Sequence, residues 1–485
     1  MNPQAKETRV VIVGAGPAGV RAAQALVQAG LRPVVIDEGN AAGGQIYRQP
    51  PEARRRPARA LYGFEWKKAQ AVHQAWQALQ GSVQAHTRTL AWNCYRGVLD
   101  LHHPEQGYGR QPYDRLILAT GAMDRVIPLP GWDQAGVYTL GAAQISLKAQ
   151  ACLLGTRPVF LGTGPLLYLV AYQYAKAGAR VAAVLDAAPR QAKLAALPDM
   201  AARPAMAAKG AYYLAWLAAH RVPVIHGARP LAIEDDGASK VVHWRDGGGG
   251  ARRATRGDVA CLGYGLRAET QLADLAGCEF DYSPRERQWL VRRDAAGRTS
   301  RPEVYVAGDG AEPLGADAAE LAGEAAARAV LQDIGVGGQQ PRLDAIEAAT
   351  ARMRRFRRGL ETAFAWPAEL AAQCADDTLV CRCERVTAGE IRQAVREFGL
   401  REVNQVKSWT RCGMGRCQSR VCGLAAAEVV AAAAGEPSAE GVGRLRAQPP
   451  VKPVPFDAEA WSRMAASNGE GAARQAGGTA GGEGR

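Results

Sequence analysis

Six residues near the amino terminus, Gly14-Ala-Gly16-Pro17-Ala18-Gly19, constrain the fold more than any other part of this sequence. They follow a short apolar run, residues 9–13, and precede a segment expected to be helical, residues 20–29. In such a setting the first glycine makes the turn, the second lets backbone approach a pyrophosphate, and the third packs helix on strand. A second apolar strand ends at Asp37, followed by Glu38, where a carboxylate can accept ribose hydroxyls. The pattern predicts a βαβ unit that binds a dinucleotide.

A second unit of the same kind begins in the middle of the chain. The apolar residues 158–161 lead into Gly162-Thr-Gly164-Pro165, and a return strand ends at Asp186. Leu167 replaces the third glycine, which would hold the helix further from the strand. Two readings stay open for this unit. It binds an adenosine ribose without a 2′-phosphate, or it is a packing domain that has lost its nucleotide.

Two further buried strands complete the expected α/β architecture. One ends at Thr120 and Gly121, and the other ends at Gly308 and Asp309 before an alanine-rich helix at residues 317–331. The sequence therefore predicts an α/β fold with two Rossmann-like dinucleotide-binding domains, the second inserted between two parts of the first.

Half of the ten cysteines lie between positions 381 and 422. Cys381 and Cys383 form one close pair, and Cys412, Cys417 and Cys422 follow about thirty residues later, with no histidine after His243. Two residues apart on an extended segment, the first pair points to one face. Four soft thiolate ligands are what a [2Fe–2S] cluster needs. A zinc site with four thiolates is the alternative that the same cysteines could build.

Composition excludes several other classes of protein. The chain has a net charge of +13, and its densest local run of basic residues is Arg54-Arg55-Arg56 with Arg59, among prolines of an expected loop. No nucleic-acid-binding signature accompanies this run. No run of eighteen apolar residues occurs, so no membrane span is expected. Clustered rather than evenly spread cysteines do not resemble a secreted disulfide framework, so a reducing cytoplasm is the expected compartment.

The dinucleotide motifs resemble those of the flavoprotein disulfide-reductase superfamily. In that superfamily the aspartate of the late Gly-Asp pair, here Asp309, reaches the flavin ribityl and pyrophosphate region, and the stretch at Gly44 and Gln45 lies beside the flavin. The resemblance implies FAD at the first site. Neither of the two dinucleotide-binding domains carries a Cys-x-x-Cys pair, so disulfide-reductase chemistry is not expected.

The cysteine segment resembles the bacterioferritin-associated-ferredoxin-like [2Fe–2S] domain. It is closest to the version fused to the large subunits of opine oxidases, dye-linked proline and hydroxyproline dehydrogenases and hydrogen cyanide synthase, where Gly-Met-Gly-x-Cys-Gln-x-x-x-Cys recurs. Carried onto this sequence, the resemblance implies Cys381, Cys383, Cys417 and Cys422 as ligands and Cys412 as a nearby spare. Ser419 stands where relatives often have glycine.

The resemblance implies an electron-transferring large subunit of a hetero-oligomeric dehydrogenase that oxidises an opine, imino acid or D-amino acid. It further implies a smaller amino-acid-oxidase-like FAD subunit, a small ferredoxin-like subunit, FMN at a subunit interface, and ATP or NAD at the second nucleotide site. No acid–base catalytic residue can be identified from the sequence. The alternatives are an NAD(P)H-dependent flavin and iron–sulfur reductase, and a non-enzymatic binding module that uses the cluster for docking.

The expected domain layout follows from these segments. Residues 1–148 and 271–335 form the FAD-binding domain, residues 149–270 the second nucleotide-binding domain, and residues 336–375 a helical linker. Residues 376–434 form the small helical [2Fe–2S] domain. Residues 435–485, rich in Pro, Gly, Ala and Ser, are expected to be a flexible tail.

Overall fold

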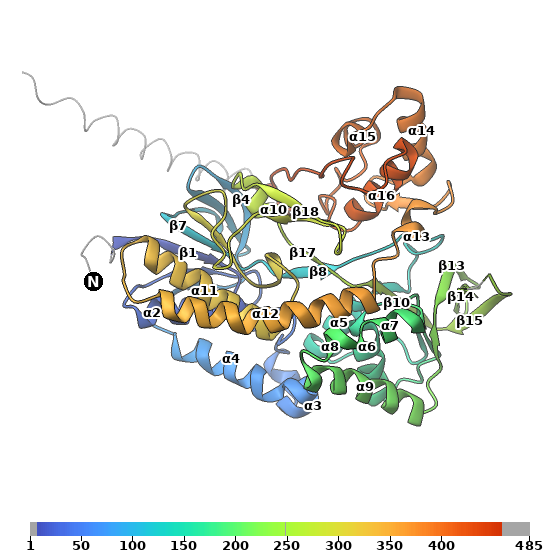
Figure 1. Cartoon of the computed structure of the whole chain (residues 1–485), viewed down its shortest axis with the longest axis horizontal. Coiled ribbons are helices and arrows are strands. Elements are labelled where there is room, and N and C mark those ends of the chain that lie inside the picture. The colour runs from blue at the N-terminus through green and yellow to red at the C-terminus, as the bar shows by residue number, and fades with distance from the viewer. Residues whose placement is uncertain (1–6, 248, 458–485) are drawn as a thin grey trace, which may run out of the picture.

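The computed structural model describes residues 7–247 and 249–457 of the chain (Figure 1). The first domain is built on a five-stranded, fully parallel sheet with the strand order β20-β7-β1-β2-β3. Its strands are β1 (Val10–Val13), β2 (Val34–Ile36), β3 (Gln84–His86), β7 (Arg115–Leu118) and β20 (Val304–Val306). This order places the first glycine-rich turn, after β1, in the middle of the sheet.

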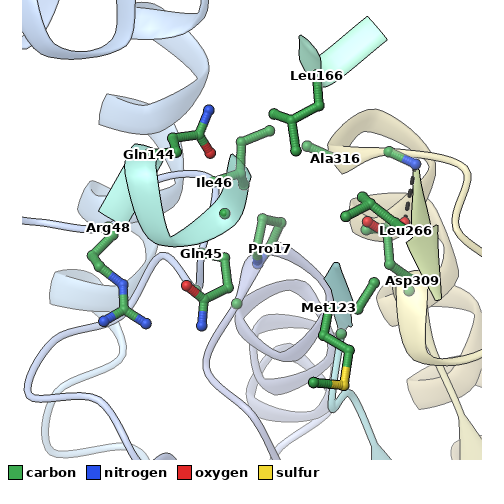
Figure 2. Close-up of a pocket in the computed structure, with 18 of the residues that line it drawn as sticks. Pro17, Gln45, Ile46, Arg48, Met123, Gln144, Leu166, Leu266, Asp309 and Ala316 are labelled. Atoms are coloured by element: carbon green, nitrogen blue, oxygen red, sulfur yellow. Dashed lines mark hydrogen bonds between the residues drawn. The ribbon is translucent and has the colours of Figure 1, made fainter. Parts of the chain in front are cut away.

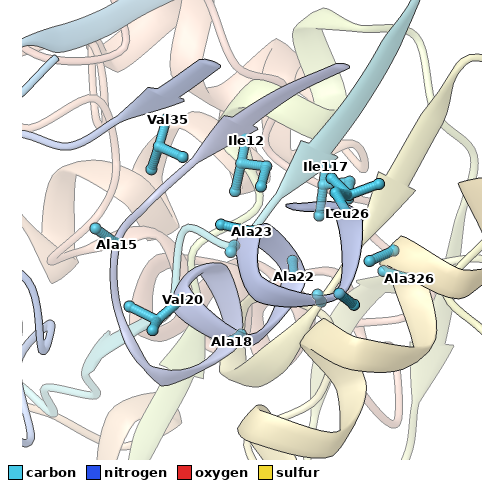
Figure 3. Close-up of a cluster of buried hydrophobic side chains, with 14 of the residues drawn as sticks. Ile12, Ala15, Ala18, Val20, Ala22, Ala23, Leu26, Val35, Ile117 and Ala326 are labelled. Carbon is cyan, nitrogen blue, oxygen red and sulfur yellow. The ribbon is translucent and has the colours of Figure 1, made fainter. Parts of the chain in front are cut away.

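Helices α2 (Pro17–Gln28) and α11 (Ala316–Asp333) cover one face of this sheet. Figure 3 shows the packing: Ile12, Val35 and Ile117 from the strands contact the small side chains of α2, and Ala326 of α11 closes the cluster. A Cβ on Gly323 would lie 1.9 Å from the carbonyl oxygen of Ala18. The two helices therefore approach each other at backbone distance, which explains why both are rich in alanine and glycine.

The opposite face is covered by a three-stranded antiparallel sheet. Its strands are β4 (Leu90–Tyr95), β5 (Val98–His103) and β6 (Gly107–Pro112), with the short helix α10 (Gln271–Leu275) beside them. Apolar side chains such as Leu99 pack against Val11 and Ile36 of the parallel sheet. Both faces of the sheet are thus buried, as its continuous apolar strands require.

The second domain has its own five-stranded parallel sheet, with the order β12-β11-β10-β16-β9. Its strands are β9 (Val137–Thr139), β10 (Pro158–Thr163), β11 (Ala183–Asp186), β12 (Val224–His226) and β16 (Val259–Tyr264). Helices α5 (Leu140–Ala149), α6 (Pro165–Lys176) and α9 (Pro204–Ala219) pack on one face, and the antiparallel strands β13 (Ala228–Asp235), β14 (Lys240–Asp246) and β15 (Arg252–Gly257) on the other. Because β9 pairs with β16, this sheet begins before residue 149, the boundary expected from the sequence.

Helix α12 (Gln340–Ala363) runs along both domains in Figure 1. It packs on α11 of the first domain and on α7 (Arg190–Ala195) and α8 (Leu197–Met200) of the second. A Cβ on Gly359 would lie 2.9 Å from Cγ of Met200, so the contact with α8 is close. The helical linker expected at residues 336–375 therefore contains a long helix that braces the two domains against each other.

The cysteine-rich domain sits at the end of this brace, shown in red in Figure 1. It contains β21 (Leu379–Cys381), β22 (Val386–Thr387), α14 (Ala388–Phe398), α15 (Val403–Thr410) and α16 (Gly423–Ala434), preceded by α13 (Ala368–Ala372). Capping boxes begin two of these helices, Thr387 with Glu390 at α14 and Glu402 with Gln405 at α15. Within the described ranges, no helix is long and apolar enough to cross a membrane.

The chain after α16 returns to the first domain. Val451 is buried, and its amide donates to the carbonyl oxygen of Trp92 at 2.9 Å. Lys452 forms an ion pair with Glu38. Ala439 and Val442 pack in the core of the cysteine-rich domain. Parts of the segment expected as a flexible tail are therefore packed against these two domains; residues 458–485 lie outside the described part of the chain.

Candidate FAD and iron–sulfur sites

A cavity of about 1160 Å³ lies between the two parallel sheets. Such a volume exceeds that of most small-molecule pockets and suits an extended dinucleotide. Most of the residues singled out from the sequence line it: Gly14, Gly16, Pro17, Ala18, Asp37, Glu38, Gly44, Gln45, Thr120, Gly121, Pro165, Gly308 and Asp309. Gly19, Gly162, Gly164 and Asp186 do not belong to its wall.

The glycines of the first turn serve different needs. Gly14 has φ +106°, and a Cβ on Gly19 would lie 1.7 Å from the carbonyl oxygen of Gly14, so packing alone requires both. Gly16 is different, because the nearest protein atom to its ideal Cβ is 3.7 Å away and its φ is an ordinary −72°. A side chain there would project into the cavity. The residues present therefore fit a ligand whose pyrophosphate lies against Gly16.

Two carboxylates frame the two ends of this binding surface. Asp37 accepts hydrogen bonds from the amides of Ala15 at 2.5 Å and Gly39 at 2.6 Å, which ties the glycine turn to the end of β2. Asp309 accepts from the amide of Gly315 at 3.0 Å and lies in Figure 2 beside Leu266 and Met123. Burial raises the pKa of both carboxyl groups.

The loop after β2 and the strand β7 close the same surface. The amide of Gly43 donates to the carbonyl oxygen of Ala15 at 2.9 Å, and Gly44 lies over Gly16, leaving Gln45 exposed to the cavity. The Thr120 hydroxyl donates to the carbonyl oxygen of Glu269 at 2.6 Å. Its role in this structure is to join the two halves of the domain.

The second glycine-rich turn is arranged differently. Asp186 is fully buried, and its carboxylate accepts from the Tyr168 hydroxyl, the Lys193 ammonium and the amide of Ala188. Burial opposes ionisation, but His226 and Lys193 outweigh it and lower the pKa of Asp186. An acid held in this way is a structural anion and does not face the cavity.

Helix α12 also covers this part of the second domain. The ring of Phe364, the residue that ends α12, lies 6.1 Å from the ring of Tyr168, and the Lys193 ammonium lies 5.5 Å from the Phe364 ring centre. Leu360 of α12 lines the cavity beside Pro165 and Leu166. The chain itself therefore occupies space next to the second glycine-rich turn.

The five cysteines of the C-terminal domain gather in one nest. The sulfur atoms of Cys381, Cys412 and Cys422 all lie within 4.8 Å of one another and are buried. The Cys417 thiol hydrogen-bonds with the thiols of Cys422 and Cys383 and extends the nest towards the surface. Cys412, expected to be a nearby spare, thus lies in the buried centre, while Cys383 and Cys417 form the more exposed edge.

The thiols of this nest shift one another's pKa values through hydrogen bonds. Hydrogen bonds from Cys412 and Cys422 lower the pKa of Cys381 to about 2, and a hydrogen bond from Cys422 lowers the pKa of Cys417. The same contacts raise the pKa values of Cys412 and Cys422. Closely packed thiols that share protons in this way form a donor set suited to soft metal ions.

Glycine allows the two cysteine segments to meet. A Cβ on Gly415 would lie 2.3 Å from Cβ of Cys383 and 3.1 Å from Glu384. Any larger residue at this position would push the second cysteine loop away from the first pair.

The cysteine loop is attached to the cavity wall by residues that the sequence alone did not reveal. Arg267 donates to the carbonyl oxygens of Ser419 and Arg420 at 3.3 and 3.2 Å, and Gln271 donates to that of Gln418 at 2.5 Å. Arg420 forms an ion pair with Glu269 at 2.6 Å. Arg420 and Val421, which lie between Cys417 and Cys422, line the cavity. The cysteine nest and the cavity therefore share a wall.

Comparisons with known proteins agree with this arrangement. The family model described as pyridine nucleotide-disulphide oxidoreductase matches residues 8–331, and a BFD-like [2Fe-2S] binding domain matches residues 379–432. An opine oxidase subunit of Agrobacterium tumefaciens is 35% identical over 92% of this chain and 90% of its own length. Hydrogen cyanide synthase subunit HcnB of Pseudomonas aeruginosa is 31% identical over 93% of this chain and 98% of its own.

A solved structure shows the same fold. L-proline dehydrogenase from P. horikoshii matches 93% of this chain and 78% of its own chain with a TM-score of 0.66 at 17% identity. The expected fold class, two Rossmann-like domains followed by a small helical [2Fe–2S] domain, is confirmed.

Proposed function

Because this chain belongs to the pyridine nucleotide-disulphide oxidoreductase family and ends in a BFD-like [2Fe–2S] domain, we propose that it is the electron-transferring large subunit of a hetero-oligomeric dehydrogenase. The complex oxidises the C–N bond of an opine, an imino acid or a D-amino acid. FAD and a [2Fe–2S] cluster are the cofactors of the chain, and it is a flavin-dependent oxidoreductase.

One observation carries the proposal: the segment between Cys417 and Cys422 lines the cavity that holds the dinucleotide-binding residues. A flavin takes up electrons in pairs and a [2Fe–2S] centre passes them singly, so the two together divide a two-electron oxidation into one-electron steps. The residues of this chain hold the two sites next to each other. Arg420 and Val421 form part of the wall between them.

We assign the FAD site to residues around the first glycine-rich turn: Gly14, Gly16, Pro17, Ala18, Gly19, Asp37, Glu38, Gly44, Gln45, Thr120, Gly121, Gly308 and Asp309. The backbone against Gly16 receives the pyrophosphate, and Asp37 receives the ribose. We assign the cluster to Cys381, Cys383, Cys417 and Cys422. Cys412 then lies beside the cluster without binding it.

The second site, with Gly162, Gly164, Pro165 and Asp186, is not proposed to turn over NAD(P)H. Asp186 already accepts three hydrogen bonds, and α12 lies beside the turn. These contacts favour the packing-domain reading, and they leave the NAD(P)H-dependent reductase without a binding site for its reductant. A nucleotide such as ATP or NAD at this site would need the Asp186 cluster to open.

The partners are proposed from the relatives, which are named as subunits. A smaller amino-acid-oxidase-like FAD subunit would oxidise the substrate carbon, with FMN at the interface between subunits and a small ferredoxin-like subunit completing the complex. The proposed compartment is the cytoplasm, because ten cysteines without a disulfide suit a reducing environment.

Copurification from the native host tests this proposal. We expect the complex to contain FAD, iron and sulfide and to reduce a dye with an opine, imino acid or D-amino acid. The isolated chain should contain its cofactors and reduce no dye with the same substrates. Substrate turnover by the isolated chain would refute the division of labour. Rapid bleaching of the flavin by NADH, with none of these substrates active, would favour the reductase instead.

A further inference from the structure

One lysine on the cavity wall has no acidic partner. Lys148, near the end of α5, is only 5% exposed. Its ammonium donates to the carbonyl oxygen of Ile46 at 3.1 Å, and no carboxylate in residues 7–247 or 249–457 forms an ion pair with it. An ammonium has three N–H donors, and the protein accepts one of them. A buried, unpaired cation is costly unless something satisfies it.

Lys148 belongs to a group of charged side chains on the cavity wall, of which Lys209 and Glu65 act on its ammonium. Lys209 of α9 pairs with Glu65 at 2.5 Å, and Lys68 of α4 (Trp66–Ala78) bridges Glu65 at 3.2 Å and Asp317 at 2.6 Å. Arg203 pairs with the same Asp317 at 2.5 Å. With Lys148, this flank of the cavity has four cations and two carboxylates, and all six residues line the cavity. The four cations and two carboxylates leave two positive charges in excess.

The flank faces the end of the cavity where the flavin-side residues lie. Figure 2 shows Gln144, one helical turn before Lys148 on α5, on the same wall as Ile46 and Gln45. Residues four apart on a helix share a face, so Lys148 continues this wall towards α9. The ammonium therefore lies on the cavity wall next to Ile46 and near Gln45, one of the residues assigned to the dinucleotide.

We propose that Lys148, supported by Lys209 and Arg203, binds the oxyanion of a second small ligand, a carboxylate or a phosphate, in this flank of the cavity. This goes beyond the proposed function, because none of these residues belongs to the FAD or cluster sets. Burial, together with the charge of Lys209, lowers the pKa of Lys148 to about 8, so the amine is largely protonated at neutral pH. A bound oxyanion would occupy the free N–H donors and offset the excess charge.

The test uses the full chain with its cofactors and two probes, succinate for a carboxylate and inorganic pyrophosphate for a phosphate. Binding is measured as the rise in the thermal midpoint, at ionic strength matched with potassium chloride, and as perturbation of the flavin absorbance. We expect one probe to bind the natural protein more tightly, which identifies the class of ligand. Lys148→Met should weaken that probe about tenfold or more, as expected for loss of a charge-assisted hydrogen bond.

Two variants make the result specific. Lys148→Arg keeps the charge and should retain binding within a few fold, while Lys67→Met removes an exposed lysine outside the cavity and should change nothing. Lys148→Met should still fold, because methionine keeps the apolar stem and removes a buried charge. The inference is overturned if neither probe stabilises the natural protein, or if Lys148→Met binds as well as the natural protein. The thermal measurement needs no turnover, so it is independent of the proposed dehydrogenase activity.

Discussion

At the scale of single residues, the most informative position is Gly16, because the packing of the protein would allow a side chain there. Gly14 and Gly19 are required by the fold itself, since their neighbours leave no room for a side chain. Gly16 is free of such neighbours and faces the cavity. A bound ligand therefore explains why residue 16 is glycine. At this turn, Gly14 and Gly19 serve folding and Gly16 serves binding.

This separation gives a prediction for Gly16→Val. The added branched side chain would fill the space assigned to the pyrophosphate, at a cost typical of overpacking, so we expect flavin occupancy to fall about tenfold or more. The flavin absorbance of the purified protein measures occupancy, and circular dichroism checks the fold. Gly337→Ala, at a position with nothing within 4 Å, is the control and should keep its flavin. Normal flavin content in Gly16→Val would contradict the assignment.

Two aspartates, Asp37 and Asp186, occupy the same place in the sequence pattern but have different surroundings, which the sequence does not predict. Asp37 and Asp186 each stand at the end of the second strand of a βαβ unit. The sequence predicted a ribose contact for Asp37 and left it open for Asp186. In the structure Asp37 lines the cavity, whereas Asp186 is buried under Tyr168 and Lys193. The strand determines the position of the carboxylate. The partners of the Asp186 carboxylate, such as His226, are distant in sequence, so no local sequence pattern predicts them.

At the scale of elements, the cysteine nest consists of two loops with different tasks. The first consists of the end of β21, with Cys381, and the tight turn that follows it, with Cys383. The second lies between α15 and α16 and carries three of the five thiols. A [2Fe–2S] cluster binds four cysteine thiolates, so one of the five thiols in the nest does not bind the metal. The proposed set keeps the two cysteines of the exposed edge, Cys383 and Cys417, and omits Cys412.

Serine substitutions distinguish the members of the nest. Cys412→Ser should keep about two iron atoms per chain and the visible absorption of the cluster, while Cys383→Ser should lose both, because serine is a poor substitute for a thiolate on iron. Iron analysis and the EPR signal of the reduced protein measure the result. The opposite outcome, with loss in Cys412→Ser and retention in Cys383→Ser, would show that the three buried thiols bind the metal. Zinc in place of iron would leave both proteins with the flavin absorption alone and without the EPR signal of a reduced cluster.

Elements with a strong local signal were predicted well from the sequence. The strands at β1, β2, β10 and β20 are continuous apolar runs next to glycine-rich turns, and the alanine-rich helix expected at residues 317–331 is present as α11, Ala316–Asp333. The strand β9 was not predicted, because three residues gain their strand character only by pairing with β16. Lys148 was also missed for a physical reason: its burial depends on α9 and the loop after β2, which the sequence places far from it.

At the scale of the whole molecule, three ion pairs in the described part of the chain join residues 420–444, in and just after the cluster domain, to residues 269–287 of the flavoprotein body. Arg420 pairs with Glu269 at 2.6 Å, Arg287 with Glu428 at 2.7 Å and Arg444 with Asp274 at 2.5 Å. The side chains of Arg420 and Glu428 are less than a tenth exposed. Buried pairs of this kind fix geometry, because breaking one leaves an uncompensated charge.

Arg420→Ala should therefore loosen the joint between the domains. The change leaves Glu269 without its partner and removes a donor to the Val451 carbonyl, at a cost of about 3 kcal/mol. For a domain of this size we expect the cluster absorbance to bleach about 10 °C or more earlier on heating. Arg416→Ala, an exposed arginine in the same loop, should bleach at the normal temperature. Equal bleaching temperatures in the two variants would show that the ion pair contributes nothing to the joint.

The position of α12 has a consequence for electron transfer out of the protein. An iron–sulfur domain on a flexible linker can move between electron donor and acceptor, and the rate of electron transfer then depends on the viscosity of the medium. Here a 24-residue helix and three ion pairs connect the iron–sulfur domain to the rest of the protein. These contacts favour a fixed position for the domain, so we expect the electron acceptor to diffuse to it. With the proposed ligand set, we expect the electron to leave at the edge formed by Cys383 and Cys417, which are less buried than the other three cysteines.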